Sequence, residues 1–269
     1  MLTREQVNHW KEEGYVIIPD FFNSEEVALM REEMENLCEN GHGRNPVTDG
    51  DGETSSKKAI NLQIIPLRDK SELFKGLPFI PKVKHALTNL LGPNVVQVLD
   101  QIFLKPAKSG AATGWHTDNA YFNTPDPTKG TGLWIALHDA NEANGTMRVI
   151  PKSHLQELKH VRDMNSDHHI TCATEIDPSQ SVLVEVPAGG CIFFNFAVAH
   201  ATGDNPTDKP RAGAAFHYAT PELARQGNDH WQNTCTVLHG EDKDNHFKPY
   251  EEQPALNLWE SEKKSISVS

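Results

Sequence analysis

The sequence lacks the features that mark secreted and redox-active small domains. Its four cysteines, Cys38, Cys172, Cys191 and Cys235, are widely spaced and form no C-x-x-C pair. This spacing gives no support to a zinc finger or a thioredoxin-like motif. The N-terminus carries no basic stretch followed by an apolar one, so no secretory signal is predicted. We expect reduced thiols in a cytoplasmic protein.

Long hydrophobic runs and clusters of basic residues are also missing. The longest apolar run, CIFFNFAVA, is about half as long as a membrane-spanning helix. Lys and Arg number 25 against 37 Asp and Glu, which gives a formal net charge of −12. No basic run is present to bind a phosphate backbone. We therefore expect a soluble protein without nucleic-acid or membrane partners, a monomer or a weak homo-oligomer that binds a small-molecule substrate.

Composition and length favour a single globular domain. Hydrophobic residues make up 37% and charged residues 23% of the 269 residues, which is typical of folded proteins. We expect one domain over residues 1–269, with a mostly helical N-terminal layer at 1–94, a β-barrel core at 95–220 and a polar, peripheral segment at 221–269.

The N-terminal layer is predicted from helix signals. Thr3 and Gln6 have the spacing of a capping box, which predicts a helix over residues 3–13. GYVIIPDFF is typical of a strand, and NSEEVALMREEMENLCEN is predicted to be a helix that Gly41 ends.

Two further segments complete the N-terminal layer. Residues 41–58 are rich in Gly, Ser, Asp and Asn and predict a mobile loop or a lid. Residues 72–92, ELFKGLPFIPKVKHALTNLLG, are predicted to form one more helix.

From residue 95 onward the hydrophobic period changes to two. Turn residues separate VVQVLDQIFLKP, GLWIALHDA, TMRVIP, SVLVEVPAGGCIFFNFAVAH and RAGAAFHYAT. Many short strands without alternating helices favour a sandwich or barrel over a doubly wound sheet. The sequence therefore predicts a mainly β protein with helices packed on its barrel.

A candidate metal site lies in the stretch GWHTDNAYF. His116 and Asp118 would point to the same side of an extended strand. An imidazole and a carboxylate supply two of the three protein ligands in the facial triad of non-haem Fe(II) oxygenases. Alone, this triplet is more often an ordinary polar loop. A third ligand is offered by His200, which would lie on the cavity side of CIFFNFAVAH if that strand is regular.

A candidate carboxylate-binding residue follows the third ligand. The segment HATGDNPTDKPRAGAAFHY turns and returns as a strand, and this hairpin is predicted to place Arg211 beside His200. A guanidinium group binds a carboxylate through two parallel charged hydrogen bonds, as a dicarboxylate co-substrate requires. Gly213 and Ala215 would share the face of Arg211 and leave room for a ligand.

The set H116-T-D118, H200 and R211 resembles the phytanoyl-CoA dioxygenase family of Fe(II)- and 2-oxoglutarate-dependent oxygenases. LTREQVNHWKEEGYVIIPDFFNSEEV, FLKP, GLWIALHDANEANGTMRVIPKSH and VPAGGCIFFNFAVAHATGDNPTDKPRAGAAFHY resemble segments of that family in the same order. The resemblance implies a double-stranded β-helix, which is a jelly-roll or cupin-like barrel, with N-terminal helices packed on it. The family's PGSH is PKSH here, at residues 151–154, which changes only a turn.

The resemblance also implies the residues that bind the cofactors. The implied Fe(II) ligands are His116, Asp118 and His200. The implied 2-oxoglutarate residues are Arg211 for the distal carboxylate, Thr202 with its hydroxyl beside it, Gln101, Trp134 and, as a weaker match, Gln63, whose place Lys57 or Lys58 could take. O₂ would be the second co-substrate.

The expected reaction is hydroxylation of a C–H bond in a small-molecule metabolite, with release of succinate and CO₂. The alternatives are desaturation, epoxidation or oxidative cyclisation of a natural-product intermediate. A zinc hydrolase or a metal-binding barrel without turnover is a further alternative, although a hydrolase has no need of Arg211. Asp118 stands where related halogenases carry a small residue, which disfavours halogenation.

The substrate itself is less closely defined by the sequence. The candidate substrate residues are Asn61, Gln97, Asn119, Tyr121, Phe122 and His217. Four polar residues, Asn61, Gln63, Gln97 and Asn119, favour a compact polar metabolite. His168 and His169 are predicted to be a solvated pair in a polar loop.

Overall fold

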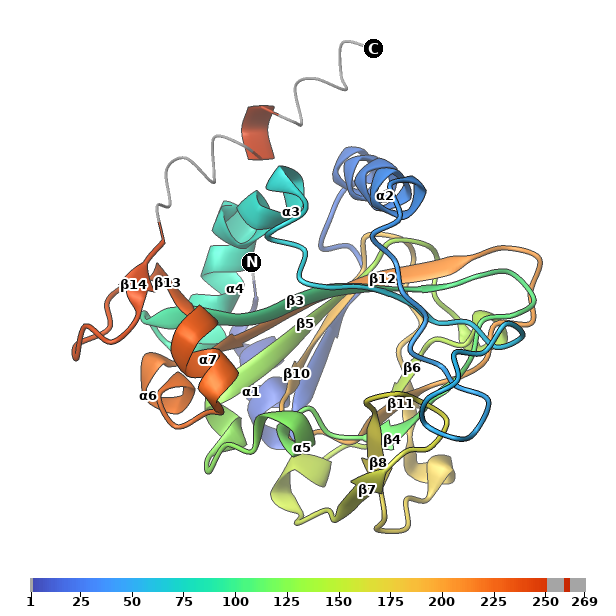
Figure 1. The fold of residues 1–269 in the computed structure, drawn as a ribbon. Coiled ribbons are helices and arrows are strands. Elements are labelled where there is room, and N and C mark those ends of the chain that lie inside the picture. The colour runs from blue at the N-terminus through green and yellow to red at the C-terminus, as the bar shows by residue number, and fades with distance from the viewer. Residues whose placement is uncertain (1, 251–258, 262–269) are drawn as a thin grey trace.

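Two facing β-sheets form the centre of the protein, and helices cover the outer face of the larger sheet (Figure 1). The computed structural model describes residues 2–250 and 259–261. None of the helices in these residues is long and apolar enough to cross a bilayer. Over the same residues, the two sheets face each other as in a jelly roll but do not join into one continuous barrel.

The larger sheet has eight strands, in the order β1, β10, β5, β12, β3, β13 and β14, with β2 also paired to β3. All of its pairs are antiparallel except that between β13 and β14. Its strands are β1 Tyr15–Ile18, β2 Leu62–Ile64, β3 Val95–Lys105, β5 Gly130–Ala136, β10 Cys191–Asn195, β12 Arg211–Ala219, β13 Thr236–His239 and β14 Lys248–Pro249. Four of these strands lie outside residues 95–220. β1 and β2 precede this range, and β13 and β14 follow it.

The smaller sheet has four short strands and carries an additional hairpin beside it. Its order is β4, β11, β6 and β9. The strands are β4 Thr113–His116, β6 Met147–Val149, β9 Val182–Leu183 and β11 His200–Thr202, and the hairpin strands are β7 His160–Arg162 and β8 Ile170–Cys172.

The first helix begins at the cap that the sequence predicts. Thr3 and Gln6 form the capping box of α1, Arg4–Glu13, which confirms that prediction. α2, Ser24–Glu39, is capped by Asn23 in the same way. The later helices are α5 Asn119–Phe122, α6 Pro221–Ala224 and α7 Asp229–Thr234, and the other 3₁₀ turns are Pro127–Lys129, Glu142–Asn144, Ser153–Leu155 and Pro178–Gln180.

The prediction of one helix over residues 72–92 is wrong. The segment forms α3, Glu72–Gly76, a 3₁₀ turn, Leu77–Phe79, and α4, Pro81–Leu91. Pro81 explains the break before α4, because a proline disfavours helical backbone in the residue before it, and Ile80 is extended. Pro78 has no N–H group to donate to a continuing helix.

Alternation along the strands divides the apolar residues between two cores. Ile135, Ala214 and Phe216 point to the helical layer and pack with residues of α2, α3 and α4. Trp134, Ala215 and Phe194 point the other way, into the space between the two sheets. The larger sheet is therefore buried on both faces, which explains why its strands read as nearly continuous hydrophobic runs.

The single run SVLVEVPAGGCIFFNFAVAH is in fact divided between the sheets. β10 ends at Asn195, whose carbonyl oxygen accepts from the Val198 N–H and whose side chain accepts from the Ala197 N–H, at 2.9 and 3.0 Å. The chain turns there, and His200 begins β11 in the smaller sheet. The predicted regular strand through His200 is therefore wrong. The predicted hairpin pairing of His200 with Arg211 is also wrong, because β12 pairs with β3 and β5.

The described part of the segment 221–269 is not peripheral, which corrects that expectation. β13 pairs with β3 at the edge of the larger sheet. Leu223, Trp231 and Leu238 are buried, and Trp231 packs on the rings of Phe122 and Phe196. Residues 251–258 and 262–269 lie outside the described part of the chain.

Candidate metal and co-substrate site

A cavity of about 200 Å³ lies between the two sheets, and it is lined by the predicted iron ligands and by Arg211. His116 ends β4 and His200 begins β11, where the two residues are partners across the smaller sheet. Asp118 lies two residues beyond His116 at the start of α5. A turn, rather than a continued strand, therefore brings the carboxylate to the imidazoles.

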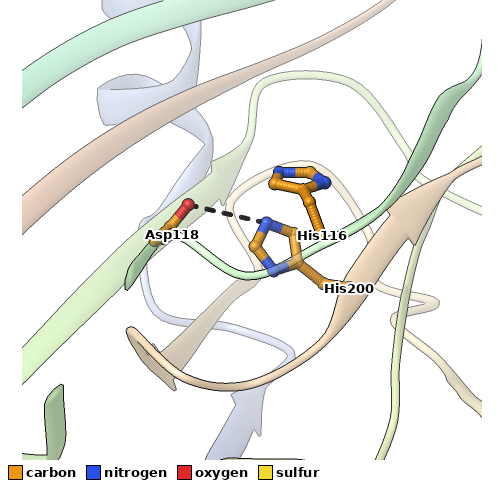
Figure 2. Close-up of side chains that lie close together, drawn as sticks. All are labelled: His116, Asp118 and His200. Atoms are coloured by element: carbon orange, nitrogen blue, oxygen red, sulfur yellow. Dashed lines mark ion pairs between the residues drawn. The ribbon is translucent and has the colours of Figure 1, made fainter. Parts of the chain in front are cut away.

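The three side chains converge on one point (Figure 2). One ligand atom from each of His116, Asp118 and His200 lies within 4.8 Å of the others. The Asp118 Oδ1 to His200 Nε2 distance is 3.8 Å. Two imidazoles and one carboxylate on one side of a point match the donor set of a facial triad, which leaves the opposite side open for other ligands.

Backbone hydrogen bonds hold both imidazoles with Nε2 toward that point. His116 Nδ1 lies 2.8 Å from the carbonyl oxygen of Gly114, and His200 Nδ1 lies 3.0 Å from that of Val198. A carbonyl oxygen can only accept, so each Nδ1 carries the hydrogen and each Nε2 keeps its lone pair. This orientation by an outer hydrogen bond is usual for metal-binding histidines.

The protonation states also suit a metal. Burial, together with the neighbouring His200, lowers the pKa of His116 to about 3. Burial would raise the pKa of Asp118, but His217, His200 and His116 outweigh it and lower that pKa to about 2. At neutral pH the site thus offers a neutral imidazole and a carboxylate, the forms in which these side chains bind metals. The residues present fit Fe(II).

A pair of buried cations lies at one end of the cavity. Lys105 and Arg211 are partners across β3 and β12, and each is 1% exposed. Lys105 donates to the carbonyl oxygen of Ala111, and Arg211 donates to that of Gly145. Within residues 2–250 and 259–261, no carboxylate forms an ion pair with either side chain, and the Arg211 Nε–H has no partner.

These cations cost free energy unless an anion joins them. Burial lowers the pKa of Arg211 to about 10. Burial and the neighbouring Arg211 lower the pKa of Lys105 well below its ordinary value, which Asp204 offsets in part. A buried charge without a partner is unfavourable, so this end of the cavity is suited to a carboxylate. The sequence analysis did not identify Lys105 as a co-substrate residue. The available signal was only that a lysine ends an apolar strand.

The other predicted co-substrate residues surround the same end. The Arg211 guanidinium carbon lies 5.7 Å from the ring centre of Trp134. A Cβ atom at Gly213 would lie 2.2 Å from Trp134 Nε1, so the indole fills the space that the glycine was predicted to leave for a ligand. Thr202 lines the cavity, and its hydroxyl accepts from the Thr113 N–H at 3.2 Å.

The sequence profile of the family described as phytanoyl-CoA dioxygenase (PhyH) matches residues 10–213. The chain belongs to the phytanoyl-CoA dioxygenase family. It is an Fe(II)- and 2-oxoglutarate-dependent oxygenase, as its sequence predicts.

Named relatives of this family member span most of the chain. Phytanoyl-CoA dioxygenase 1 of Oryza sativa subsp. japonica is 26% identical, over 86% of this chain and 93% of the relative. Ectoine dioxygenase of Bordetella parapertussis is 25% identical, over 82% of this chain and 76% of the relative.

Solved structures of similar fold include a non-heme monooxygenase and an epimerase bound to iron and α-ketoglutarate. The non-heme monooxygenase ThoJ has a TM-score of 0.69 and 25% identity and covers 98% of both chains. The epimerase SnoN, in complex with Fe³⁺, α-ketoglutarate and a nogalamycin compound, has a TM-score of 0.70 and 20% identity and covers 93% of this chain and 96% of that one. The predicted jelly-roll fold with N-terminal helices is confirmed.

Two of the predicted substrate residues, Gln97 and Asn119, do not line the cavity. Gln97 donates to Asp100 Oδ2 at 2.7 Å, because an irregularity in the pairing of β3 with β12, between His217 and Tyr218, turns it away from the cavity face. The Asn119 side chain accepts from the Thr124 N–H and donates to the Thr124 carbonyl oxygen, at 3.0 and 3.1 Å. It holds the turn after α5.

The remaining candidates line the cavity of this oxygenase, at different places. Tyr121 and Phe122 lie near the metal ligands, and the His116 and Tyr121 rings are 5.9 Å apart. Asn61 donates to the Thr113 hydroxyl at 3.3 Å, which places it beside Thr202 rather than on the far side of the metal ligands. Gln63 donates to Gln101 Oε1 at 2.8 Å.

His217 has a role that sequence reasoning did not identify. Its Nε2 lies 3.1 Å from Asp118 Oδ2, and the side chain is 3% exposed. Phe122 and Phe196 pack against its ring. Asp118 therefore receives a hydrogen bond on one oxygen while the other faces His200. The signal available in the sequence was only that His217 follows Arg211 at an even spacing on one strand.

The expectation of a solvated His168–His169 pair holds for His168, which is exposed, but is wrong for His169, which is partly buried. Both residues line the cavity. His169 lies near His116 with nearly parallel rings 6.4 Å apart, and burial, followed by the effect of His168, lowers its pKa to about 4. The pair is brought inward because residues 163–167 pack on the loop 41–58, where Thr48 N–H donates to the Asn165 carbonyl oxygen at 2.9 Å.

Proposed function

We propose that this chain hydroxylates an aliphatic C–H bond of a small molecule. In the balanced reaction, substrate R–H, 2-oxoglutarate and O₂ give R–OH, succinate and CO₂. One oxygen atom enters the substrate and the other enters succinate, while 2-oxoglutarate supplies two electrons on losing CO₂. The observation that carries the proposal is that a His-Asp-His cluster and two buried, unpaired cations line the same cavity.

The proposal assigns the metal to His116, Asp118 and His200. When bound there, Fe(II) supplies the activation of O₂ that no amino-acid side chain provides. The protein's part is to fix the ligands, which the hydrogen bonds to Gly114 and Val198 support. His217 positions Asp118 by occupying its second oxygen.

The co-substrate is assigned to the cationic end of the cavity. Arg211 and Lys105 would bind the distal carboxylate of 2-oxoglutarate, and the unpartnered Arg211 Nε–H adds a free donor. Thr202 and Asn61 would contribute neutral hydrogen bonds. Trp134 excludes water by covering the guanidinium. A zinc hydrolase has no use for this second, cationic site, which favours the oxygenase reaction.

Named relatives support a small molecule as substrate, since they include dioxygenases of ectoine and, with the qualifier probable, of hypophosphite. The loop 41–58 is proposed to be the lid over this substrate. Its bonds to residues 163–167, which carry the chain to His168 and His169, support that role.

Succinate formation from 2-oxoglutarate, with Fe(II) and O₂ supplied, tests the proposal in the wild type and in His116→Ala. We expect turnover in the wild type, loss of it in His116→Ala, and no change in His9→Ala, which alters an exposed histidine of α1. Product mass then separates the outcomes: a gain of one oxygen supports hydroxylation or epoxidation, and a loss of two hydrogens shows desaturation or ring closure. Preferential zinc binding without succinate formation would contradict the proposal.

A further inference from the structure

The charged residues of the cavity are confined to two places. Lys105 and Arg211 lie at the co-substrate end, and Asp118 belongs to the metal cluster. The wall that remains is mainly apolar and aromatic. It is formed by Ile65, Leu99, Phe103, Tyr121 and Phe122.

The polar side chains in this remaining wall are uncharged, and their hydrogen-bonding groups are already engaged. Gln63 already donates to Gln101 and accepts from Arg44 Nη2, both at 2.8 Å. The Tyr121 hydroxyl accepts from the Ile170 N–H at 3.1 Å. The His169 ring lies among aromatic rings, with its centre 6.4 Å from that of Phe103 and 6.5 Å from that of Tyr121.

Asp163 lies close enough to act on Tyr121 and His169, but it does not line the cavity, and it accepts two hydrogen bonds from Asn165. Arg44 also lies near this wall and is already engaged. Its Nη1 pairs with Asp167 at 2.5 Å, and its Nη2 contacts His168 at 3.1 Å. The Arg44 side chain is 48% exposed, so it lies at the surface side of His168. A charged group that entered the cavity would therefore lose its hydration without gaining a free partner of opposite charge.

The expectation of a compact polar metabolite thus loses its basis. Gln97 and Asn119 do not line the cavity, and Asn61 lies beside Thr113 at the co-substrate end. Gln63 alone remains near the apolar wall, with both ends of its amide engaged.

We propose that the part of the substrate that enters this cavity is uncharged and largely apolar, a ring or branched hydrocarbon that bears hydroxyl, carbonyl or amide groups rather than a carboxylate, phosphate or ammonium group. This inference rests on the proposed function, because it takes the cationic end to be filled by 2-oxoglutarate. The cavity of about 200 Å³ is shared with the co-substrate, so only a compact portion of the substrate fits beside the metal ligands.

Three probes built on one ring test the inference: cyclohexanecarboxamide, cyclohexanecarboxylate and aminomethylcyclohexane. Each is added at neutral pH to the protein with Fe(II), 2-oxoglutarate and O₂, and the rise in succinate formation and the oxidised product are measured. We expect the amide to stimulate turnover roughly tenfold or more beyond either charged probe, since a buried unpaired charge is costly. Equal or stronger stimulation by a charged probe, or no stimulation by any of them, would overturn the inference.

A pair of variants at one wall position sharpens the test. Ile65→Glu supplies a carboxylate in the apolar wall, whereas Ile65→Gln has nearly the same shape without the charge. We expect Ile65→Glu to shift the preference between amine and amide roughly tenfold toward the amine, and Ile65→Gln to leave that preference unchanged. The same ratio in both variants would show that this wall does not contact the substrate.

Calorimetric binding of 2-oxoglutarate to the Fe(II) protein under nitrogen, without any probe, separates the two proposals. Loss of this binding would overturn the proposed function and the inference together. Intact binding combined with a wrong order among the probes would overturn the substrate class alone.

Discussion

The two sheets hold their functional residues by different means. β3 and β12 of the larger sheet are 11 and nine residues long, and all of β12 is buried. The ligand-bearing strands β4 and β11 of the smaller sheet have four and three residues. Packing on both faces therefore fixes Lys105 and Arg211, whereas His116 and His200 depend on single hydrogen bonds to nearby carbonyl groups.

From this difference we expect that variants can disturb co-substrate binding and metal binding separately. A change in the larger sheet alters the charge of a rigid wall. A change around the smaller sheet alters the orientation of a ligand. His217 is the informative exception, because it lies in the larger sheet and bonds to Asp118.

The largest effect is expected for Arg211→Met, which tests the separation of the two functions. The affinity for 2-oxoglutarate should fall on the order of 10²- to 10³-fold, because one partner of a buried charged contact is lost. Metal affinity should stay within a few-fold of wild type. Titration calorimetry measures both, with Arg148→Met as a control at a partly exposed arginine of the smaller sheet. A matching loss of metal affinity would break the comparison.

His217 variants test the link between the sheets. His217→Leu should weaken metal binding by about 10- to 100-fold, since a hydrogen bond that orients a ligand is removed. His217→Gln keeps an N–H donor and should recover most of the affinity. Competition with a metal-binding dye measures the two. Equal losses in both variants would indicate that the ring packing on Phe122 and Phe196 matters instead.

Lys105→Met tests whether the buried Lys105 amine of the larger sheet lowers the stability of the ligand-free protein. Without 2-oxoglutarate, the variant should be more stable to urea by about 1–3 kcal/mol, because a buried amine whose protonated form is disfavoured by burial is replaced by an apolar side chain. With 2-oxoglutarate, that advantage should shrink because binding weakens. An unchanged or lower stability of the ligand-free variant would contradict the assignment.

The pH dependence of that stability has a defined sign. Burial lowers the pKa of Lys105 in the folded protein below its ordinary value of 10.5. Between the lowered pKa in the folded protein and 10.5 in the unfolded chain, Lys105 is protonated more often in the unfolded chain. The wild-type stability therefore rises with pH across this range. The difference between wild type and Lys105→Met should therefore narrow as pH rises toward 10.5.

The smallest effect is expected for a variant in the loop 41–58. This variant tests whether metal or co-substrate binding depends on the loop. Thr48 Oγ1 donates to the Met164 carbonyl oxygen at 2.7 Å. Thr48→Val should raise hydrogen exchange in residues 41–58, with a loss of about 1 kcal/mol in local stability. Metal and 2-oxoglutarate affinities should not change, as in the control Thr88→Val on α4. A loss of metal affinity would tie the loop to the smaller sheet.

Local signals in the sequence predicted the features that depend on local chemistry. The capping box of Thr3 and Gln6 needs no tertiary contact to form. The convergence of His116, Asp118 and His200 was predicted from ligand types and a family resemblance, although the regular strand expected to carry His200 does not exist. The convergence of these three side chains was therefore predictable, while the path of the chain between them was not.

The features that escaped prediction depend on long-range pairing. Alternation places Gln97 on the face of Gln101, but an irregularity visible only in the pairing with β12 reverses it. His169 faces the cavity because a loop more than a hundred residues earlier holds its neighbours. The assignment of Lys105 to the co-substrate end depends on its pairing with Arg211 on the adjacent strand. None of these contacts leaves a periodic signal in the sequence.

The position of Trp134 gives the protein an optical reporter of its own. Its indole fills the space above Gly213 and lies against the Arg211 guanidinium. Indole emission responds to nearby charge, so an anion that docks on Arg211 should change the fluorescence of one of the chain's five tryptophans. Trp134→Phe would silence that change, and co-substrate loading could then be followed in real time without a label or a turnover assay.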